Sequence, residues 1–169
     1  MPHTPAGLAA FNALDQEDAE KELLACCASR AFAREVAARR PYPDQERLTE
    51  TAGQAVLALD WPAVLEALSA HPRIGERPAG DSREAAWSRR EQAGVGDEQR
   101  AALAEGNRAY EERFGHVYLV CATGRTGAEM LRLLRERLGH DEETERRTVR
   151  EELAKITRLR AGKLAEGDR

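Results

Sequence analysis

Apolar residues recur every three or four positions along almost the whole chain, which is the period of an amphipathic α-helix. The first such stretch starts at Asp15 and runs to Pro41 and Pro43, which cannot continue a helix. The only strand-like run is VYLVCA, residues 117–122, and one short strand has no partner with which to form a sheet. The pattern therefore predicts an all-α fold in which 117–122 is a buried extended segment.

Capping residues and helix breakers divide this pattern into about seven helices. Asp44, Asp60 and Ser82 stand at positions suited to N-caps, and Thr126 with Glu129 forms a capping-box sequence. Between them, Pro and Gly residues mark a loop from Ala70 onwards, and Gly115 and Gly139 mark helix ends. The predicted helices cover 15–40, 44–59, 60–69, 82–92, 97–114, 126–138 and a last helix that carries 149–159.

Length and charge limit the function classes. No repeat or long linker divides the 169 residues, so we expect one domain over 1–169, with a core of 8–164 and frayed termini. The 26 Lys and Arg are interspersed with 30 Asp and Glu, for a net charge of −4, so no basic surface for nucleic acid or an anionic membrane is predicted. No apolar run is long enough to span a bilayer, and the N-terminus lacks a signal-peptide pattern.

The cysteines and histidines show no metal or cofactor pattern. Cys26, Cys27 and Cys121 make a poor disulfide framework, because their number is odd and two are adjacent, and this predicts a cytoplasmic protein. The four histidines have no metal-site spacing among themselves or with the cysteines, so no metal is predicted. GRTG, residues 124–127, lacks the spacing and the lysine of a phosphate-binding loop and is interpreted as a capped loop.

One loop and one helix combine residues suited to acid/base chemistry. His71 lies in the loop AHPRIGE, and the helix from Ser82 places Ser88, Glu91 and Gln92 on one face, since positions i, i+3 and i+4 fall together. Taken separately, a loop histidine is more often structural or exposed, and so polar a helix face is more often solvated. Together they supply an imidazole that titrates near neutrality, a hydroxyl, a carboxylate and an amide.

Several segments in a fixed order resemble the 2-oxo-4-hydroxy-4-carboxy-5-ureidoimidazoline (OHCU) decarboxylase family. The resemblance covers about residues 8–164 and is most specific where HPRIG is followed by SxxEQAG. It implies a cofactor-free helical decarboxylase of urate degradation, usually a homodimer, that acts on a small-molecule substrate and releases (S)-allantoin and CO2. The segments are FNALDQEDAEKELLACCASRAFAREVAARRPY, AHPRIGE, SRREQAG, YEERFGHVYLVCATG, ERLGHDEETE and EELAKITRLR.

The resemblance also assigns roles to residues of this chain. The catalytic histidine and carboxylate of the family fall on His71 and Glu91. The predicted substrate contacts are Pro72, Ser88, Gln92, the stretch Tyr118, Leu119, Val120, Cys121 and Ala122, and Arg158. The chain departs from the family at FGHVY, where the family often has FGFPF, and the preceding loop is several residues short. A decarboxylase of the same fold acting on another ureido or imidazoline acid, and a binding module without turnover, stay open as alternatives.

Helix phase supports the choice of Arg158 among four basic residues of the segment KITRLRAGK. Ile156 and Leu159 are taken to mark the buried side of the last helix, which places Arg158 at the edge of the apolar stripe. Its neighbours Lys155, Arg160 and Lys163 are interpreted as solvated charges that suit the C-terminal end of a helix.

Overall fold

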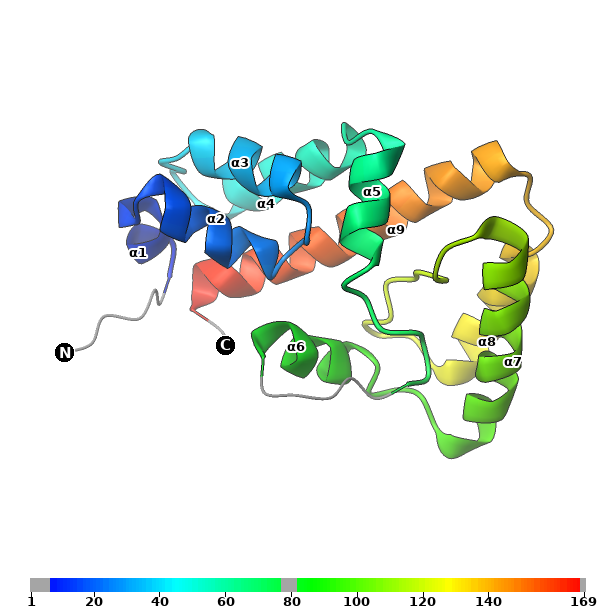
Figure 1. The fold of residues 1–169 in the computed structure, drawn as a ribbon. Helices are drawn as coiled ribbons and strands as arrows, with labels where there is room; N and C mark the ends of the chain where they lie inside the picture. The colour runs from blue at the N-terminus through cyan, green and yellow to red at the C-terminus, as the bar shows by residue number, and fades with distance from the viewer. Residues whose placement is uncertain (1–6, 77–81, 168–169) are drawn as a thin grey trace. The chain divides into compact units, whose positions relative to one another are not determined.

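The computed structural model describes residues 7–76 and 82–167, and these form two compact units (Figure 1). Unit 1 combines residues up to Ala67 with those from Leu153 onwards, and unit 2 is Leu68–Glu152. The predicted single domain stays a prediction. In chain order the helices are α1 (Leu8–Ala13), α2 (Gln16–Leu24), α3 (Arg30–Ala38), α4 (Gln45–Leu57), α5 (Trp61–Leu68), α6 (Arg83–Glu91), α7 (Asp97–Phe114), α8 (Gly127–Arg137) and α9 (Glu142–Glu166).

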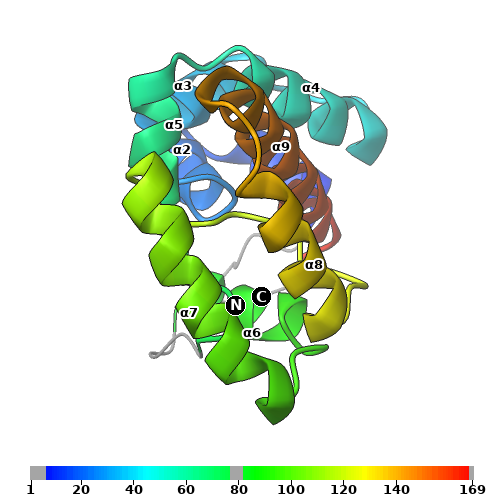
Figure 2. The same ribbon diagram turned by 90° about the vertical axis from the view of Figure 1, so that its right-hand side faces the viewer.

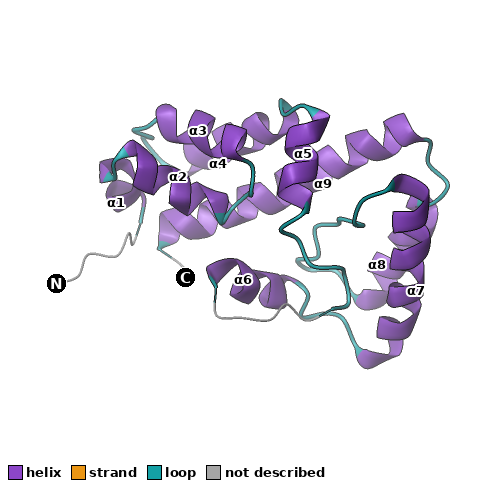
Figure 3. Cartoon of the chain, in the orientation of Figure 1, coloured by secondary structure: helices purple, strands orange, loops and turns teal. Residues whose placement is uncertain are grey.

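The all-α prediction is confirmed, because every regular element of the described residues is a helix (Figure 3). Residues 117–122 form neither helix nor strand, and Tyr118 to Ala122 are buried, as predicted for this segment. Among the described residues, no helix has the combination of length and apolar character that a membrane span requires.

The described part of the chain holds nine helices, two more than the sequence pattern predicts. A short helix, α1, precedes Asp15, whose carboxylate accepts a 2.7 Å hydrogen bond from the Asp18 N–H and so starts α2. The predicted helix over 15–40 is also divided, because Ser29 caps a new helix, its Oγ accepting from the N–H of Phe32 at 3.3 Å. Ser29 is fully buried, so its hydroxyl needs this partner.

The predicted helix starts are confirmed by their capping hydrogen bonds. Each cap satisfies an N–H that the first turn leaves without a helical partner, a contribution of about 1 kcal/mol. The acceptor side chains and donor N–H groups are Asp44 with Arg47 (2.8 Å), Asp60 with Ala63 (2.9 Å), Ser82 with Ala85 (3.1 Å) and Thr126 with Glu129 (3.1 Å). At the other end of α7, Gly115 has φ = 80°, which permits the left-handed turn that ends the helix.

The buried face of α9 within unit 1 differs from the predicted one. Leu159 is 43% exposed, whereas Arg160 is only 4% exposed and donates from Nη1 to the carbonyl of Ala25 at 3.4 Å. The interpretation of Arg160 as a solvated charge is therefore wrong, as is the choice of Leu159 for the buried side. The buried stripe follows Ile156, Arg160 and Leu164, at four-residue spacing.

We predict that this protein loses stability in alkaline solution. Burial raises the pKa of the Cys27 thiol and of the Tyr42 hydroxyl to about 12 each. In the unfolded chain these groups titrate near 8.5 and 10, so above those values the unfolded state binds fewer protons than the folded state. The stabilisation is complete below the unfolded pKa values and is lost as the pH rises towards 12. Each pH unit in this window costs about 1.4 kcal/mol for a fully buried group.

Urea unfolding at pH 8 and pH 10.5 checks this prediction, because the midpoint should fall at the higher pH. Cys27→Ala serves as the control, since removal of the thiol should make the fall smaller. A midpoint that is equal at both pH values in the wild-type chain would contradict the expected effect.

Unit 2 is built around the pair α7 and α8, which pack against each other (Figure 2). The two helices approach closely at Gly106, where an added Cβ would lie 2.4 Å from a methyl carbon of Leu134. Beneath them lies one apolar cluster, which also takes in the extended segment. Its fully or nearly fully buried members are Ile74, Leu103, Tyr110, Tyr118, Val120, Ala122, Met130 and Leu134.

Candidate active site

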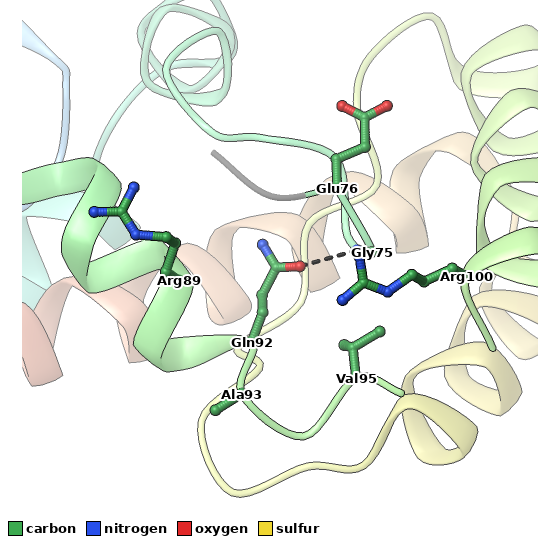
Figure 4. A pocket seen from close by; sticks show the side chains of 7 residues that line it. All are labelled: Gly75, Glu76, Arg89, Gln92, Ala93, Val95 and Arg100. Carbon is green, nitrogen blue, oxygen red and sulfur yellow. Dashed lines mark hydrogen bonds between the residues drawn. The ribbon is translucent and has the colours of Figure 1, made fainter. Parts of the chain in front are cut away.

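The loop that carries His71 is attached directly to the end of α6. The Gly75 N–H donates to Gln92 Oε1 at 2.9 Å (Figure 4), so the HPRIG and SxxEQ sequences meet in space. On α6, Ser88 is 5% exposed, while Glu91 and Gln92 are half-buried. His71 is half-buried too, and its backbone N–H donates to the Leu68 carbonyl at 3.0 Å. Imidazole, carboxylate and amide are thus carried by two segments that hold each other.

The same loop is fixed on its opposite side by α7. Asn107 is 1% exposed and donates from Nδ2 to the Ile74 carbonyl at 2.8 Å, and the Ile74 side chain belongs to the apolar cluster. Arg73 forms a forked ion pair with Glu111, with N–O distances of 2.8 and 3.1 Å. Bonds on both sides of the loop leave it little freedom, which suits a catalytic residue that must hold one orientation.

A second junction links the end of α6 to the turn after the extended segment. The Gly127 N–H donates to the Gly94 carbonyl at 3.2 Å. An added Cβ at Gly94 would lie 2.4 Å from the Arg125 carbonyl oxygen, so only glycine allows this approach of the two backbones. The His71 loop, α6 and the 118–122 segment therefore converge within unit 2.

Side chains hold the extended segment, since it lacks the backbone hydrogen bonds of a regular element. Arg137 donates from Nη1 to the Leu119 carbonyl at 2.5 Å, and Arg125 donates from Nε to the Cys121 carbonyl at 3.1 Å. The Cys121 N–H donates to Glu152 Oε1 at 3.0 Å. Val120 is 2% exposed, and within the described part of the chain its own N–H and carbonyl take part in no hydrogen bond. A buried peptide group of this kind is suited to a ligand.

Arg137 belongs to a buried charged cluster. It donates from Nε and Nη2 to Glu145 Oε2 at 2.8 and 2.5 Å, and the two residues are 4% and 0% exposed. Burial alone would lower the pKa of Arg137, but the hydrogen bonds and charge of Glu145 outweigh it and raise the pKa. Burial also raises the pKa of Tyr118, so its hydroxyl stays neutral and donates to the Met130 carbonyl at 2.9 Å.

A cavity of about 210 Å³ lies beside the junction of the His71 loop and α6. Figure 4 shows the Arg100 guanidinium directed towards Gly75 and Gln92, while Arg89 lies on the other side of the cavity. The lining carries two guanidinium groups, an amide and the Glu76 carboxylate, and guanidinium and amide N–H groups suit the oxygens of a carboxylate or carbonyl ligand. The lining residues are Gly75, Glu76, Arg89, Gln92, Ala93, Val95 and Arg100. Of the predicted site residues, only Gln92 is among them.

Arg158 belongs to unit 1, where it lies across α4. It is exposed, and an added Cβ at Gly53 would lie 2.1 Å from Arg158 Nε, so its side chain rests on the gap that this glycine leaves. Among the described residues, no group of three or more His, Cys, Asp or Glu side chains is placed to hold a metal ion.

Known proteins match this chain over the segments that form the candidate site. The sequence profile of the OHCU decarboxylase family matches residues 12–162, which include every predicted site residue. The chain belongs to the OHCU decarboxylase family. The family expectation from the sequence is therefore confirmed.

Curated relatives of this decarboxylase-family chain come from a plant and a fish. It is 37% identical over 158 residues to the uric acid degradation bifunctional protein TTL of Arabidopsis thaliana, and this match covers 88% of the chain but 48% of that protein. The chain thus spans about half the length of the plant relative. It is also 32% identical over 126 residues to the 2-oxo-4-hydroxy-4-carboxy-5-ureidoimidazoline decarboxylase of Amia calva, a match that covers 72% of each protein.

Solved structures show the same helical fold. An OHCU decarboxylase crystallised in the presence of (S)-allantoin superposes with a TM-score of 0.73 at 34% identity, over 85% of this chain and 96% of that one. An (S)-allantoin synthase superposes with a TM-score of 0.68 at 17% identity, over 93% of this chain and 53% of that one, and shows likeness of fold alone.

Sequence reasoning on this decarboxylase-family chain missed the residues that support the site. The extended segment is supported by three charged residues, Arg137, Glu145 and Glu152. In the local sequence these look like the charged residues of any solvent-exposed helix face. A signal was present, because each lies in phase with the apolar stripe of its helix. Arg137 lies seven residues after Met130 and three after Leu134, on the same side of α8. Arg89 and Arg100 carried no comparable signal.

Proposed function

We propose that this chain decarboxylates OHCU to (S)-allantoin and CO2 as a step of urate degradation, without a cofactor. The observation that carries the proposal is the hydrogen bond between Gly75 and Gln92, which unites the two family motifs at one place. Family membership and the names of the relatives support the substrate. No cofactor is needed, since the ring imine next to the leaving carboxylate can accept the electron pair that CO2 leaves behind.

His71 and Glu91 are the proposed catalytic pair. Loss of CO2 leaves a carbon that must be protonated on one face, and an imidazole on a fixed loop can deliver or orient that proton. Glu91 at the end of α6 offers a carboxylate to the ureido and ring N–H groups of the substrate, and charge-assisted hydrogen bonds of this kind are about twice as strong as neutral ones. Pro72, the next residue, is a proposed substrate contact.

The remaining proposed contacts surround this pair. Ser88 and Gln92 share a face of α6 with Glu91, and Gln92 already uses its carbonyl oxygen on Gly75, so its amide nitrogen is the group directed to substrate. The extended segment 118–122 contributes backbone groups, of which those of Val120 are the most suitable because the fold does not use them.

Turnover of freshly prepared OHCU tests the proposal, followed by CO2 release and by circular dichroism of the product. Uncatalysed protonation has no facial preference and yields racemic allantoin, so an enzyme-dependent optical signal of the (S) form is the expected result. The activity should survive exhaustive treatment with EDTA. Absence of acceleration, or a racemic product, would contradict the proposal, and turnover of another ureido acid instead would favour the alternative substrate.

We predict that Arg158→Lys lowers kcat/KM roughly thirtyfold. This factor corresponds to a loss of about 2 kcal/mol in transition-state stabilisation, which is the scale of a charge-assisted hydrogen bond. A lysine keeps the charge but not the planar fork that binds two substrate oxygens. The measurement is steady-state kinetics, with thermal unfolding to confirm that stability is nearly unchanged. Arg147→Lys, at an exposed position on the same helix, is the matched control. Arg160 is unsuitable for this purpose because it is buried. Equal, small effects at both positions would mean that Arg158 does not contact substrate.

A cytoplasmic homodimer is also proposed. The three cysteines are buried and form no disulfide, in agreement with a reducing compartment. The chain has a mass of 18.7 kDa, so light scattering should give about twice this value for the dimer, and a monomeric mass would contradict it.

A further inference from the structure

We propose that Arg137, fixed by Glu145, is a positioning residue that holds the 118–122 segment in the conformation that binds substrate. This inference rests on the proposed function, since it concerns the segment assigned there to substrate. Arg137 itself is not proposed to touch the substrate.

The segment depends on outside groups for its conformation. Residues 117–122 form neither helix nor strand, so no regular ladder fixes their peptide groups. Apolar packing and single side-chain bonds fix their position, and the bond from Arg137 to the Leu119 carbonyl is 2.5 Å long. Leu119 immediately precedes Val120, whose peptide groups the fold leaves for a ligand. A displacement at Leu119 therefore moves Val120 with it.

The guanidinium is held on every side. Two of its nitrogens bind Glu145 Oε2 and the third binds Leu119, while its central carbon lies 4.8 Å from the ring centre of Tyr118 and 5.8 Å from that of Tyr110. The planar fork, with its faces against aromatic rings, fixes the direction of the arm that reaches Leu119. A lysine has one point charge and cannot make the three bonds together.

Glu145 is fixed in turn. Its Oε2 accepts a short hydrogen bond from the Tyr110 hydroxyl in addition to those from Arg137, and its Oε1 lies 3.0 Å from His140 Nδ1. The carboxylate thus has partners from three side chains and no exposure to solvent. A pair of this kind is weak evidence for stability, because apolar residues of similar volume often replace buried ion pairs without loss. What apolar residues cannot replace is a donor aimed at the Leu119 carbonyl.

The test is Arg137→Lys, with Arg135→Lys, an exposed position of the same helix, as the matched control. We expect KM for OHCU to rise about tenfold in Arg137→Lys and kcat to stay within about twofold, because a displaced binding segment weakens ground state and transition state alike. A role in stability alone would lower the fraction of active enzyme, and hence the apparent kcat, without changing KM. Arg135→Lys should change neither parameter.

Hydrogen exchange gives a readout that does not depend on activity. Peptides over 117–123 should exchange faster in Arg137→Lys than in the wild-type chain, while peptides from α2 to α4 stay unchanged. Unchanged exchange in 117–123, or faster exchange everywhere, would overturn the inference, as would an unchanged KM. If the wild-type chain does not decarboxylate OHCU, the proposed function fails, and the exchange experiment still decides whether Arg137 positions the segment.

A second variant covers the case in which Arg137→Lys does not fold. Arg137→Met combined with Glu145→Leu removes both charges together and keeps similar volumes. It should fold, and it should still show the raised KM and the faster exchange in 117–123, because the Leu119 carbonyl has lost its donor. A folded double variant with wild-type KM would overturn the inference.

Discussion

His71→Asn is expected to lower kcat for CO2 release from OHCU by at least about a hundredfold, the lower end of what general acid–base catalysis contributes. Asparagine keeps a polar side chain of similar reach but cannot exchange a proton near neutral pH. Hydrogen bonds and an ion pair of Gly75, Ile74 and Arg73 hold the loop and are kept in this variant, so the helical circular dichroism spectrum should not change.

His116→Asn provides the matched control for this result. His116 lies near the aromatic side chains of Tyr110 and Phe114 and is assigned no part in the chemistry, so its replacement should leave kcat within about twofold. Added imidazole should partly restore activity to His71→Ala if the ring acts on protons. Near-normal turnover in folded His71→Asn would remove His71 from the mechanism.

Glu145→Leu is expected to lower the free energy of unfolding by about 3–5 kcal/mol, the usual cost of removing one partner of a buried ion pair. The variant leaves the Arg137 guanidinium charged and nearly without solvent contact, and it also takes the acceptor from the Tyr110 hydroxyl. For a chain of this size the expected fall in Tm is about 6–20 °C. Thermal unfolding followed by circular dichroism measures it.

The double variant Arg137→Met with Glu145→Leu should recover most of that loss, because no unpaired charge is then buried. The contrast between the single and double variants separates the cost of an orphaned charge from the cost of changed packing. An exposed pair, Arg146 with Glu142, gives the comparison, and Glu142→Leu should cost less than about 1 kcal/mol. If Glu145→Leu is as stable as the wild type, Arg137 and Glu145 are not strongly coupled.

Local sequence was sufficient wherever local physics decides the structure. The helix starts at Asp44, Asp60, Ser82 and Thr126 could be predicted because each side chain binds an N–H three residues further along the chain. The burial of residues 118–122 followed from the apolar run of the sequence in the same way. The division of the first long helix was missed although Ser29 is also a local cap. The reason is that the apolar periodicity of the sequence continues across Ser29.

The candidate site was also predicted only in part from the sequence. The resemblance in HPRIG and SxxEQ predicted which residues to examine, and family membership confirmed the source of that pattern. It did not show that Gln92 would bind Gly75, or that Gly94 would approach the backbone of Arg125, because these contacts join segments distant in the chain. The roles of His71, Glu91 and Arg158 stay predictions until the variants are measured.

The sequence by itself therefore determined the all-α class, the helix starts at Asp44, Asp60, Ser82 and Thr126, the buried segment and the family. Only the tertiary structure decided which charges are buried. Arg160 and Arg137 are charged residues on helices, and each reaches a backbone carbonyl from a remote part of the chain, at Ala25 and Leu119 respectively. A charge enters the interior only where a distant partner offsets its loss of hydration, and no local pattern records whether that partner will be present.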